Sequence, residues 1–426
     1  MFGINIGIVD FSVNGMETAF MVFFIACIIY TMGKTITAPS LALGASWAGL
    51  MWTRPDGFVY IIGLALGYLL FYPVLGKTRS RTHLVKIYFF AGFILLVLYL
   101  PWTIWTWSYY KTIVPHTVIA KGLNTAFSPE NIPLLLKSGM DSISKLGFRY
   151  FYSSLKSLYP TFMPPWYSYG DWGGLPWYFS KPLAFIAAYY WILPFAKPQI
   201  RAISFATWLG HLYLTYFANV APWYIPSVTL LTIIVLSGII QQAIARSYFL
   251  NQWLASAQKI ISYAIASGIF LISLFLFLAG AYQLRLQQEI IETGHRKNIG
   301  LWLKGHANTS KDTVFLEPLG YIGFYSQLKM YDWPGLSSPE MILARKKIKI
   351  KESFGQLIEE LKPDWLVLRP HEIEQVKKDT PILLETYYHI PKIFDVSDKI
   401  MAYKFLPGRG YLEFDQTFTV FRKNGI

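Results

Sequence analysis

The stretch Trp52-Thr53-Arg54-Pro55-Asp56-Gly57 interrupts a long apolar run with a cation, a proline, an anion and a glycine. Placing Arg or Asp at the centre of a membrane helix costs roughly 2.5–3.5 kcal/mol on insertion scales, so such residues usually serve a function. Two interpretations are open from these residues alone. The stretch is either a functional site or a polar turn in which Arg54 extends to the membrane interface and pairs with Asp56.

The composition predicts a polytopic membrane protein. The 426 residues are 54% hydrophobic and 15% charged, and the mean hydropathy is +0.37, whereas soluble domains carry about 25% charged residues. The net charge of +14 does not indicate nucleic-acid binding, because much of the cationic excess lies in short loops between apolar runs. The single cysteine, Cys27, excludes a disulfide framework and a cysteine-based metal site within this sequence.

Eight apolar segments predict eight membrane spans, since a spanning helix needs about 20 residues. They are residues 16–33, 39–53, 57–74, 87–107, 182–196, 202–220, 225–245 and 260–281. The second and third segments are short and flank the Arg54 turn. Short spans interrupted by Gly or Pro often line a site instead of facing lipid.

Basic residues in the gaps between these segments predict the topology. The gaps with the same parity contain Lys34, then Lys77, Arg79, Arg81 and Lys86, then Lys197 and Arg201, then Arg246 and Lys259. The positive-inside rule makes these gaps cytoplasmic. It follows that residues 1–15, the Arg54 turn, the loop 108–181, the turn 221–224 and the chain from residue 282 onward are expected on the outer side.

The outer loop 108–181 contains about a dozen aromatic residues between Phe148 and Phe179. Two interpretations are open for them. The rings form an aromatic belt at the membrane interface, or Trp166, Trp172 and Trp177 form a platform for a sugar or a polyprenyl chain.

From residue 282 the composition becomes mixed, and the remaining residues suffice for one soluble domain. We therefore predict a transmembrane domain over 1–281 and a small α/β extracytoplasmic domain over 282–426. Helices are expected at 285–305, 338–345, 352–361 and 371–378, and strands or extended segments at 313–316, 328–331, 365–368, 385–390, 401–406 and 417–422. Gly320 and Gly323 lack the spacing of a phosphate loop.

No hydrolase, zinc-protease or kinase motif is present, and the seven histidines are too dispersed to indicate a metal cluster. We therefore predict no metal and no cofactor. The outer ends of the spans instead carry Glu17, Arg54, Asp56, Tyr109, Tyr110, His116, Lys121 and Tyr224. Cations and hydroxyl groups on one membrane face are suited to holding a lipid phosphate, with carboxylates nearby for proton transfer.

These residues carry a resemblance to a known family. Gly15-Met16-Glu17-Thr18 resembles the Gly-Leu-Glu-Thr motif of bacterial GT-C glycosyltransferases, and Arg54-Pro55-Asp56-Gly57 resembles their Arg-Pro-Asp/Glu-Gly motif. Tyr109-Tyr110, Pro115-His116-Thr117 and Ala120-Lys121 resemble their Tyr-Tyr-Gly, Pro-Asn-Thr and Ala-Lys motif. The resemblance is to polyprenyl-phosphate-sugar enzymes that include the mycobacterial terminal arabinofuranosyltransferases. The segments 299–303, 313–320, 331–336 and 363–370 are similar as well.

The resemblance implies a GT-C-like fold in a bacterial inner membrane. It also implies transfer of one sugar, normally with inversion, from a polyprenyl-phosphate carrier to an acceptor hydroxyl of a glycan, lipid or protein on the outer face. An acidic residue acts as general base, and basic residues hold the carrier phosphate. Arg54 and Lys121 suit the phosphate, with Tyr110 and His116 beside them as hydrogen-bond donors.

The sequence departs from the family pattern in two places. Lys111 and His116 stand where the family has Gly and Asn. The acidic residue that serves as base in the family is expected upstream of residue 1, which leaves Glu17 and Asp56 as candidates within this sequence. The chain is accordingly the C-terminal part of a longer protein, a chain that a separate N-terminal chain completes, or a protein that has lost catalysis.

Three hypotheses follow. The first is a membrane glycosyltransferase that acts on a lipid-linked sugar. The second is a catalytically silent glycolipid-binding or assembly subunit, favoured by the missing base. The third is a secondary transporter, which the lack of an evident inverted repeat and the large outer domain disfavour.

Overall fold

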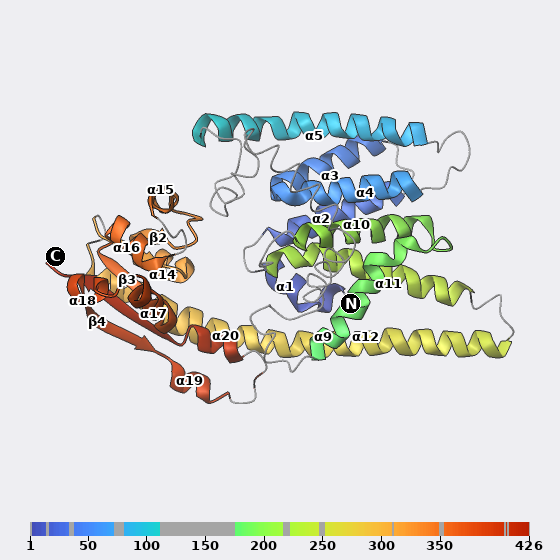
Figure 1. Ribbon diagram of the computed structural model, residues 1–426. Coiled ribbons are helices and arrows are strands. Elements are labelled where there is room, and N and C mark those ends of the chain that lie inside the picture. The colour runs from blue at the N-terminus through green and yellow to red at the C-terminus, as the bar shows by residue number, and fades with distance from the viewer. Residues whose placement is uncertain are drawn as a thin grey trace. The chain divides into compact units, whose positions relative to one another are not determined.

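A computed structural model describes residues 2–13, 17–33, 38–71, 81–110, 175–215, 222–246, 252–308, 311–348, 353–403, 406 and 409–425. These residues form two compact units, and the second unit begins at Tyr282. The predicted site residues His116 and Lys121, together with Trp166 and Trp172, lie outside the described residues. The two units are taken in turn below, with the element labels of Figure 1.

The first unit is helical throughout its described residues. Its elements are η1 (Phe2–Ile4), α1 (Ile6–Val13), α2 (Thr18–Gly33), α3 (Pro39–Thr53), η2 (Pro55–Gly57), α4 (Phe58–Phe71), α5 (Arg81–Tyr110), α9 (Leu175–Tyr189), η8 (Tyr190–Ile192), α10 (Pro198–Thr215), η9 (Pro222–Tyr224), α11 (Ile225–Arg246) and α12 (Gln252–Leu286). Every predicted apolar segment coincides with one of these helices, because long apolar runs without charges favour intra-segment hydrogen bonding in lipid.

Three described helices are long and apolar enough to cross a membrane: Arg81–Ser108, Ile225–Ala245 and Ser256–His306. A fourth is reached if the bent pair Gly7–Val13 and Thr18–Gly33 counts as one span. The prediction of eight spans is therefore wrong for the described residues. These helices indicate a membrane protein, and the described residues contain fewer complete spans than the apolar segments suggest.

Helix length explains this correction. Helices α2, α3, α4 and α9 contain 14 to 16 residues, which corresponds to about 21–24 Å at 1.5 Å per residue. The hydrocarbon core of a bilayer is about 30 Å thick. Helix α10 has 18 residues but includes Gln199, Arg201 and His211, which lower its hydropathy. Such helices cross only part of the apolar layer or pack within the protein.

Small residues allow α4 and α10 to pack closely. Gly63 and Gly67 lie one turn apart on α4 and face Ala206 and Ala202 of α10, both of which are fully buried. A Cβ added at Gly67 would lie 2.5 Å from the carbonyl oxygen of Ala202. Such small-residue patterns commonly promote helix association in membranes. The close approach of the two backbones provides van der Waals contact, whereas burying apolar surface contributes little free energy because lipid is itself apolar.

Gly67→Ala is expected to destabilise the first unit by about 1–3 kcal/mol, because the added methyl group must push the two backbones apart. Gly92→Ala on α5 is the matched control, since a Cβ there meets nothing within 4 Å. We expect the control to be neutral or stabilising by up to about 1 kcal/mol. Thermal unfolding in detergent measures both, and equal melting temperatures for the two variants would contradict the close approach.

The second unit contains a five-stranded mixed sheet with the strand order β2-β1-β3-β5-β4. The strands are β1 (Thr313–Leu316), β2 (Lys329–Asp332), β3 (Trp365–Leu368), β4 (Tyr388–Asp395) and β5 (Thr417–Lys423). Helical elements separate them: η11 (Gln287–Arg296), α13 (Lys297–His306), α14 (Leu319–Ser326), α15 (Pro339–Lys347), α16 (Phe354–Leu361), α17 (Pro370–Asp379), α18 (Leu383–Tyr387), α19 (Ser397–Met401) and α20 (Arg409–Phe414). β1 is parallel to β2 and β3, whereas β5 is antiparallel to β3 and β4. The coarse prediction of a small α/β domain is confirmed.

Helices cover both faces of this sheet. On β3, Leu366 and Leu368 join one hydrophobic cluster with residues of α15, α16, α17 and α18, whereas Trp365 and Val367 join another with residues of α13 and α14. The alternation follows from the two-residue period of a strand. A strand covered on both faces reads as a continuous apolar run, which is why Trp365–Leu368 was recognisable in the sequence.

Two of the predicted extended segments differ from the structure: 385–390 is half right, and 401–406 is wrong in its described residues. Residues 385–387 belong to helix α18, and β4 begins only at Tyr388. Met401 ends helix α19, and the described residues that follow it form a turn. In the first case Leu383 and Leu384 both pack into the hydrophobic core, and a helix turn can direct two adjacent side chains toward one core where a strand would separate them.

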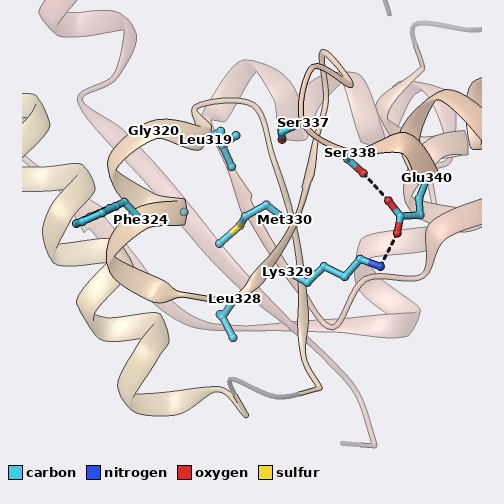
Figure 2. Close-up of a pocket in the computed structure, with 10 residues that line it drawn as sticks. Leu319, Gly320, Phe324, Leu328, Lys329, Met330, Ser337, Ser338 and Glu340 are labelled. Carbon is cyan, nitrogen blue, oxygen red and sulfur yellow. Dashed lines mark hydrogen bonds and ion pairs between the residues drawn. The ribbon is translucent and has the colours of Figure 1, made fainter. Parts of the chain in front are cut away.

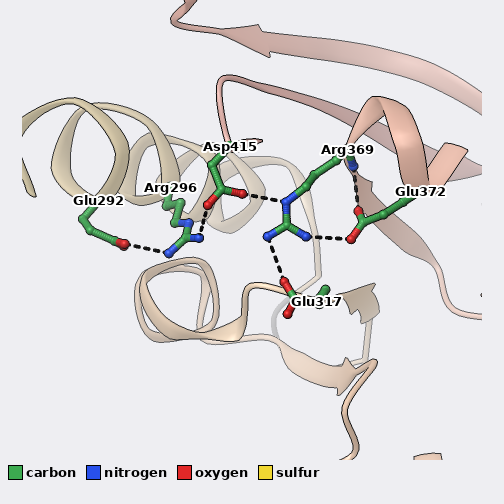
Figure 3. A network of polar contacts seen from close by, with 6 residues as sticks. All are labelled: Glu292, Arg296, Glu317, Arg369, Glu372 and Asp415. Atoms are coloured by element: carbon green, nitrogen blue, oxygen red, sulfur yellow. Dashed lines mark hydrogen bonds and ion pairs between the residues drawn. The ribbon is translucent and has the colours of Figure 1, made fainter. Parts of the chain in front are cut away.

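A network of ion pairs is buried beside the sheet. It joins two arginines and four carboxylates, which are Arg296, Arg369, Glu292, Glu317, Glu372 and Asp415 (Figure 3). Arg369 is its centre: Nε donates to Asp415 at 2.6 Å, Nη1 to Glu372 at 2.6 Å and Nη2 to Glu317 at 2.8 Å. Asp415 also accepts from Arg296. The network links β1, α17, η11 and the loop before β5.

Burial and neighbouring charges shift the pKa values of the residues in this network in opposite directions. Burial lowers the pKa of Arg369, but Asp415, Glu372 and Glu317 outweigh it and raise the pKa above its usual value. Burial raises the pKa of Glu372 more than Arg369 lowers it. The charge of Glu372 therefore depends on its arginine partner.

Candidate functional site

The Arg54 turn forms where α3 gives way to α4. Arg54 has an extended backbone, with φ −154° and ψ 136°, as expected for a residue that precedes a proline. Pro55 then begins the short helix η2, and Phe58 begins α4. The chain thus makes a tight corner between two apolar helices and directs the Arg54 side chain into the first unit, where only 6% of the residue is exposed.

The Arg54 guanidinium donates hydrogen bonds to a carboxylate close by in the chain and to a backbone carbonyl far from it. Nε and Nη2 donate to the two oxygens of Asp56 at 3.0 and 2.9 Å, which forms a bidentate pair. Nη1 donates to the backbone carbonyl of Trp223 at 3.1 Å. Bidentate pairing fixes the plane of the guanidinium as well as its position.

Tyr224 and Glu17 complete the cluster. The guanidinium lies over the Tyr224 ring, with Cζ 3.9 Å from the ring centroid. The Glu17 carboxylate approaches Arg54 Nε at 3.5 Å, and its side chain is 37% exposed. Glu17 immediately precedes α2, and Tyr224 ends η9 immediately before α11. Three helix junctions therefore meet at one arginine, and the two carboxylates give the cluster a formal charge of −1 before any ligand binds.

The cluster offers one pre-oriented cation and one accessible carboxylate. Asp56 accepts from Arg54 through both oxygens, so its evident part is to orient the guanidinium. Glu17 is more exposed than Asp56, whose side chain is 13% exposed. A guanidinium fixed in this way can bind phosphate oxygens with its remaining N–H groups.

Four of the predicted site residues come together here: Glu17, Arg54, Asp56 and Tyr224. Tyr109 and Tyr110 end helix α5, but the structure describes only their backbone. His116 and Lys121 lie outside the described residues, so their predicted part in the site stays a prediction. Within the described ranges, no three His, Cys, Asp or Glu side chains are placed to hold a metal ion.

Sequence reasoning missed two neighbours of the cluster. No side-chain motif predicts that the backbone carbonyl of Trp223 accepts a hydrogen bond. The two prolines of Pro222–Pro226 indicate only that this turn is rigid. Tyr60 lies one helical turn after Asp56, is 2% exposed and forms a side-chain hydrogen bond with Ser227 of α11. Its spacing from Asp56 could have identified it, since residues four apart share one helix face.

Comparison with known proteins concerns the second unit. A family model described as "Domain of unknown function (DUF8728)" matches residues 282–421, about a third of the chain and almost the whole of that unit. No curated protein matches the chain. The second unit is thus similar to a domain of unknown function, and the Arg54 cluster belongs to the part of the chain before the match.

Proposed function

We propose that this protein is a GT-C-like membrane glycosyltransferase that moves a sugar from a polyprenyl-phosphate carrier to an acceptor hydroxyl of a cell-envelope glycan, glycolipid or protein. The reaction takes place on the outer face of the bacterial cytoplasmic membrane, and the second unit is extracytoplasmic. In the reaction the acceptor oxygen bonds to the anomeric carbon, the bond from that carbon to the carrier phosphate breaks, and a carboxylate takes the acceptor proton.

The observation that carries the proposal is the convergence of three separate motifs on Arg54. Glu17, Asp56 and Tyr224 all contact its guanidinium. A leaving carrier phosphate gains charge as it departs, while its lipid tail stays in the bilayer. A pre-oriented cation among the ends of apolar helices meets both requirements.

Each residue has a specific part in this proposal. Arg54 binds the carrier phosphate, and Asp56 orients the guanidinium. Tyr224 supports the guanidinium from one side and keeps that side dry. Glu17 is the better-placed of the two candidate bases because it is the more exposed. Lys121, His116, Tyr109 and Tyr110 stay further candidates for phosphate and acceptor binding, which the family resemblance implies and which the described side chains do not include.

A second candidate is a glycolipid-binding subunit that performs no transfer. The engagement of both Asp56 oxygens by Arg54 favours it, because a carboxylate so occupied is poorly placed to accept a proton from an acceptor. Binding of the carrier without transfer is the result that separates this candidate from the enzyme.

The test uses membranes that contain the full chain and radiolabelled polyprenyl-phosphate sugars. We expect label to move from the lipid fraction into a more polar product, in membranes with the protein and not in membranes without it. A photoactivatable polyprenyl phosphate measures binding in the same preparation. Crosslinking without transfer identifies the silent subunit, and the absence of both refutes a lipid-linked sugar as the ligand.

A further inference from the structure

A single long helix joins an apolar span to the second unit. It runs without a break from Ser256 to His306, and the apolar segment predicted to cross the membrane ends at residue 281. Residues 282–286 add about 7 Å at 1.5 Å per residue. The headgroup layer on each side of the hydrocarbon core is about 5–8 Å thick. A crossing helix of this kind places Leu286 at the level of the lipid headgroups.

The short helix α19 packs against the long helix at this level. Buried residues of both helices form one hydrophobic cluster, against which the turn after α19 also packs: Leu286, Ile290, Ile291, Val396, Ile400 and Leu412, with Tyr403 and Leu406. Strand β4 leads the chain there, since Phe394 contacts His295 of the long helix and α19 begins three residues later. Residues 397–403, the α19 tip, therefore form the part of the second unit next to the headgroup level.

The other end of β4 lies far from this level. Trp365 packs edge to face against Trp302, which follows Leu286 by 16 residues, roughly 20 Å along the helix. The Arg422 guanidinium lies over the Trp365 ring, and β4 begins beside Arg422. Ile382, which precedes β4 by one short helix, is therefore at the distal end of the unit, and it is 70% exposed.

The α19 tip exposes an apolar side chain next to a basic one. Ile400 is buried in the cluster, but Met401 is 52% exposed, and Lys399 is exposed as well. Elements that bind a bilayer interface bury apolar side chains at the boundary of headgroups and acyl chains and extend lysines toward the phosphates. Because Asp398 offsets the charge of Lys399, contact with a bilayer would depend on apolar burial more than on net charge.

The opposite edge of the sheet has a different surface. A hollow borders the edge strand β2, and the ion pair between Lys329 and Glu340 lies on its wall (Figure 2). Ser338 donates to the same carboxylate. The two charged side chains remain 54% and 40% exposed, and removing such a pair from water costs desolvation energy. This edge is suited to water, whereas the α19 tip is suited to lipid.

We propose that the α19 tip docks on the phospholipid surface of the membrane that α12 crosses. Met401 enters the boundary between headgroups and acyl chains, and the Lys399 ammonium group reaches the lipid phosphates. Together with the long helix, this contact gives the second unit two points of attachment to the membrane. The inference goes beyond the proposed transfer reaction, because it needs neither the Arg54 cluster nor a sugar, and it holds for either side of the membrane.

The competing partner is a second copy of the chain. A stable interface buries about 800 Å² on each partner, and Met401 is the exposed large apolar side chain among the described residues of the tip. Pairing of two β4 edges would enlarge the interface, but β4 contains Pro391 and Lys392, and both residue types discourage strand addition. The position of the tip at the headgroup level therefore favours lipid.

The experiment attaches a nitroxide spin label to the full chain in nanodiscs of phosphatidylcholine and phosphatidylglycerol that hold one chain each. Met401→Cys and Ala402→Cys place the label on the tip, and Ile382→Cys is the matched control at another exposed position of the second unit. The labelled parent chain, whose single cysteine is Cys27, supplies the background signal. Power-saturation EPR compares relaxation by oxygen, which concentrates among acyl chains, with relaxation by a water-soluble nickel chelate.

We expect the ratio of oxygen to nickel accessibility to be several-fold higher at Met401→Cys and Ala402→Cys than at Ile382→Cys. Met401→Asp, measured with the label at Ala402→Cys, should lower the ratio toward the control value, because a carboxylate is excluded from an apolar layer. Equal ratios at the tip and at the control, or no effect of Met401→Asp, overturns the proposal. Thermal unfolding in the nanodiscs confirms that each variant folds.

Coverage by a second copy gives a different result. Another chain would exclude both reagents from the label at the tip, in nanodiscs that hold two chains and not in those that hold one, and this outcome also overturns the proposal. The spin-label ratios require no sugar donor. A failed transfer assay and a failed membrane contact are therefore distinguished.

Discussion

Arg54→Ala is expected to lower sugar transfer by about 10²–10³-fold, the usual loss when one pre-oriented donor for developing negative charge is removed. The effect should fall mainly on kcat, because the phosphate gains charge as the sugar leaves. Transfer from radiolabelled polyprenyl-phosphate sugars in membranes measures it. The structural basis is the three-point fixation of the guanidinium by Asp56, the Trp223 carbonyl and the Tyr224 ring.

Two further variants make this result specific. Arg54→Lys keeps the charge but cannot form the bidentate pair, so we expect a loss smaller than that of alanine. Arg81→Ala is the matched control, since Arg81 is exposed and its hydrogen bond to a described residue is to the Leu70 carbonyl, at 3.4 Å. If folded Arg54→Ala transfers sugar as well as Arg81→Ala, the carrier phosphate is bound elsewhere and only the family resemblance survives.

Arg369→Met is expected to destabilise the second unit by about 3–5 kcal/mol, the cost of breaking a buried ion pair on one side. The change leaves Glu372 without its arginine partner and removes one of the two arginines that contact Asp415, and both carboxylates are almost fully buried. Hydrogen exchange of the β1 and β3 amides in the full chain measures the loss locally.

Lys347→Met provides the comparison for this network. Lys347 also pairs with a glutamate, Glu360 at 2.6 Å, but its side chain is 67% exposed. Exposed pairs contribute about 0–1 kcal/mol, so the amides should exchange nearly as in the unmodified protein. An equally small effect of Arg369→Met would show that the carboxylates left without Arg369 become solvated or protonated. The buried network would then not contribute to the stability of the second unit.

Helices and strands were predictable where residues close together in the sequence determine them. Thr313–Leu316 and Trp365–Leu368 were recognised as strands with correct bounds, because each contains a short uninterrupted apolar run rich in β-branched and aromatic residues. Pro39–Thr53 coincides with the apolar segment 39–53, which was predicted from its hydrophobic residues. The sequence did not predict helix α14, because its two glycines are typical of a loop. In the structure, packing against α13 stabilises this segment as a helix.

The number of spans depended on tertiary structure. The eight apolar segments were correctly located, but composition does not measure where each helix stops. The described part of helix α4, Phe58–Phe71, has 14 residues and packs through Gly63 and Gly67 onto α10. In the sequence, apolar residues that pack against a neighbouring helix cannot be distinguished from apolar residues that face lipid.

The sequence by itself determined that this is a membrane protein with a terminal α/β domain, and it identified Arg54, Asp56, Glu17 and Tyr224 as candidates. Only the tertiary structure decided that they meet, because Glu17 and Tyr224 lie far from Arg54 along the chain. The carbonyl of Trp223 lies 169 residues from it. That contact uses the backbone, which every residue shares, so only folding selects which carbonyl completes the site.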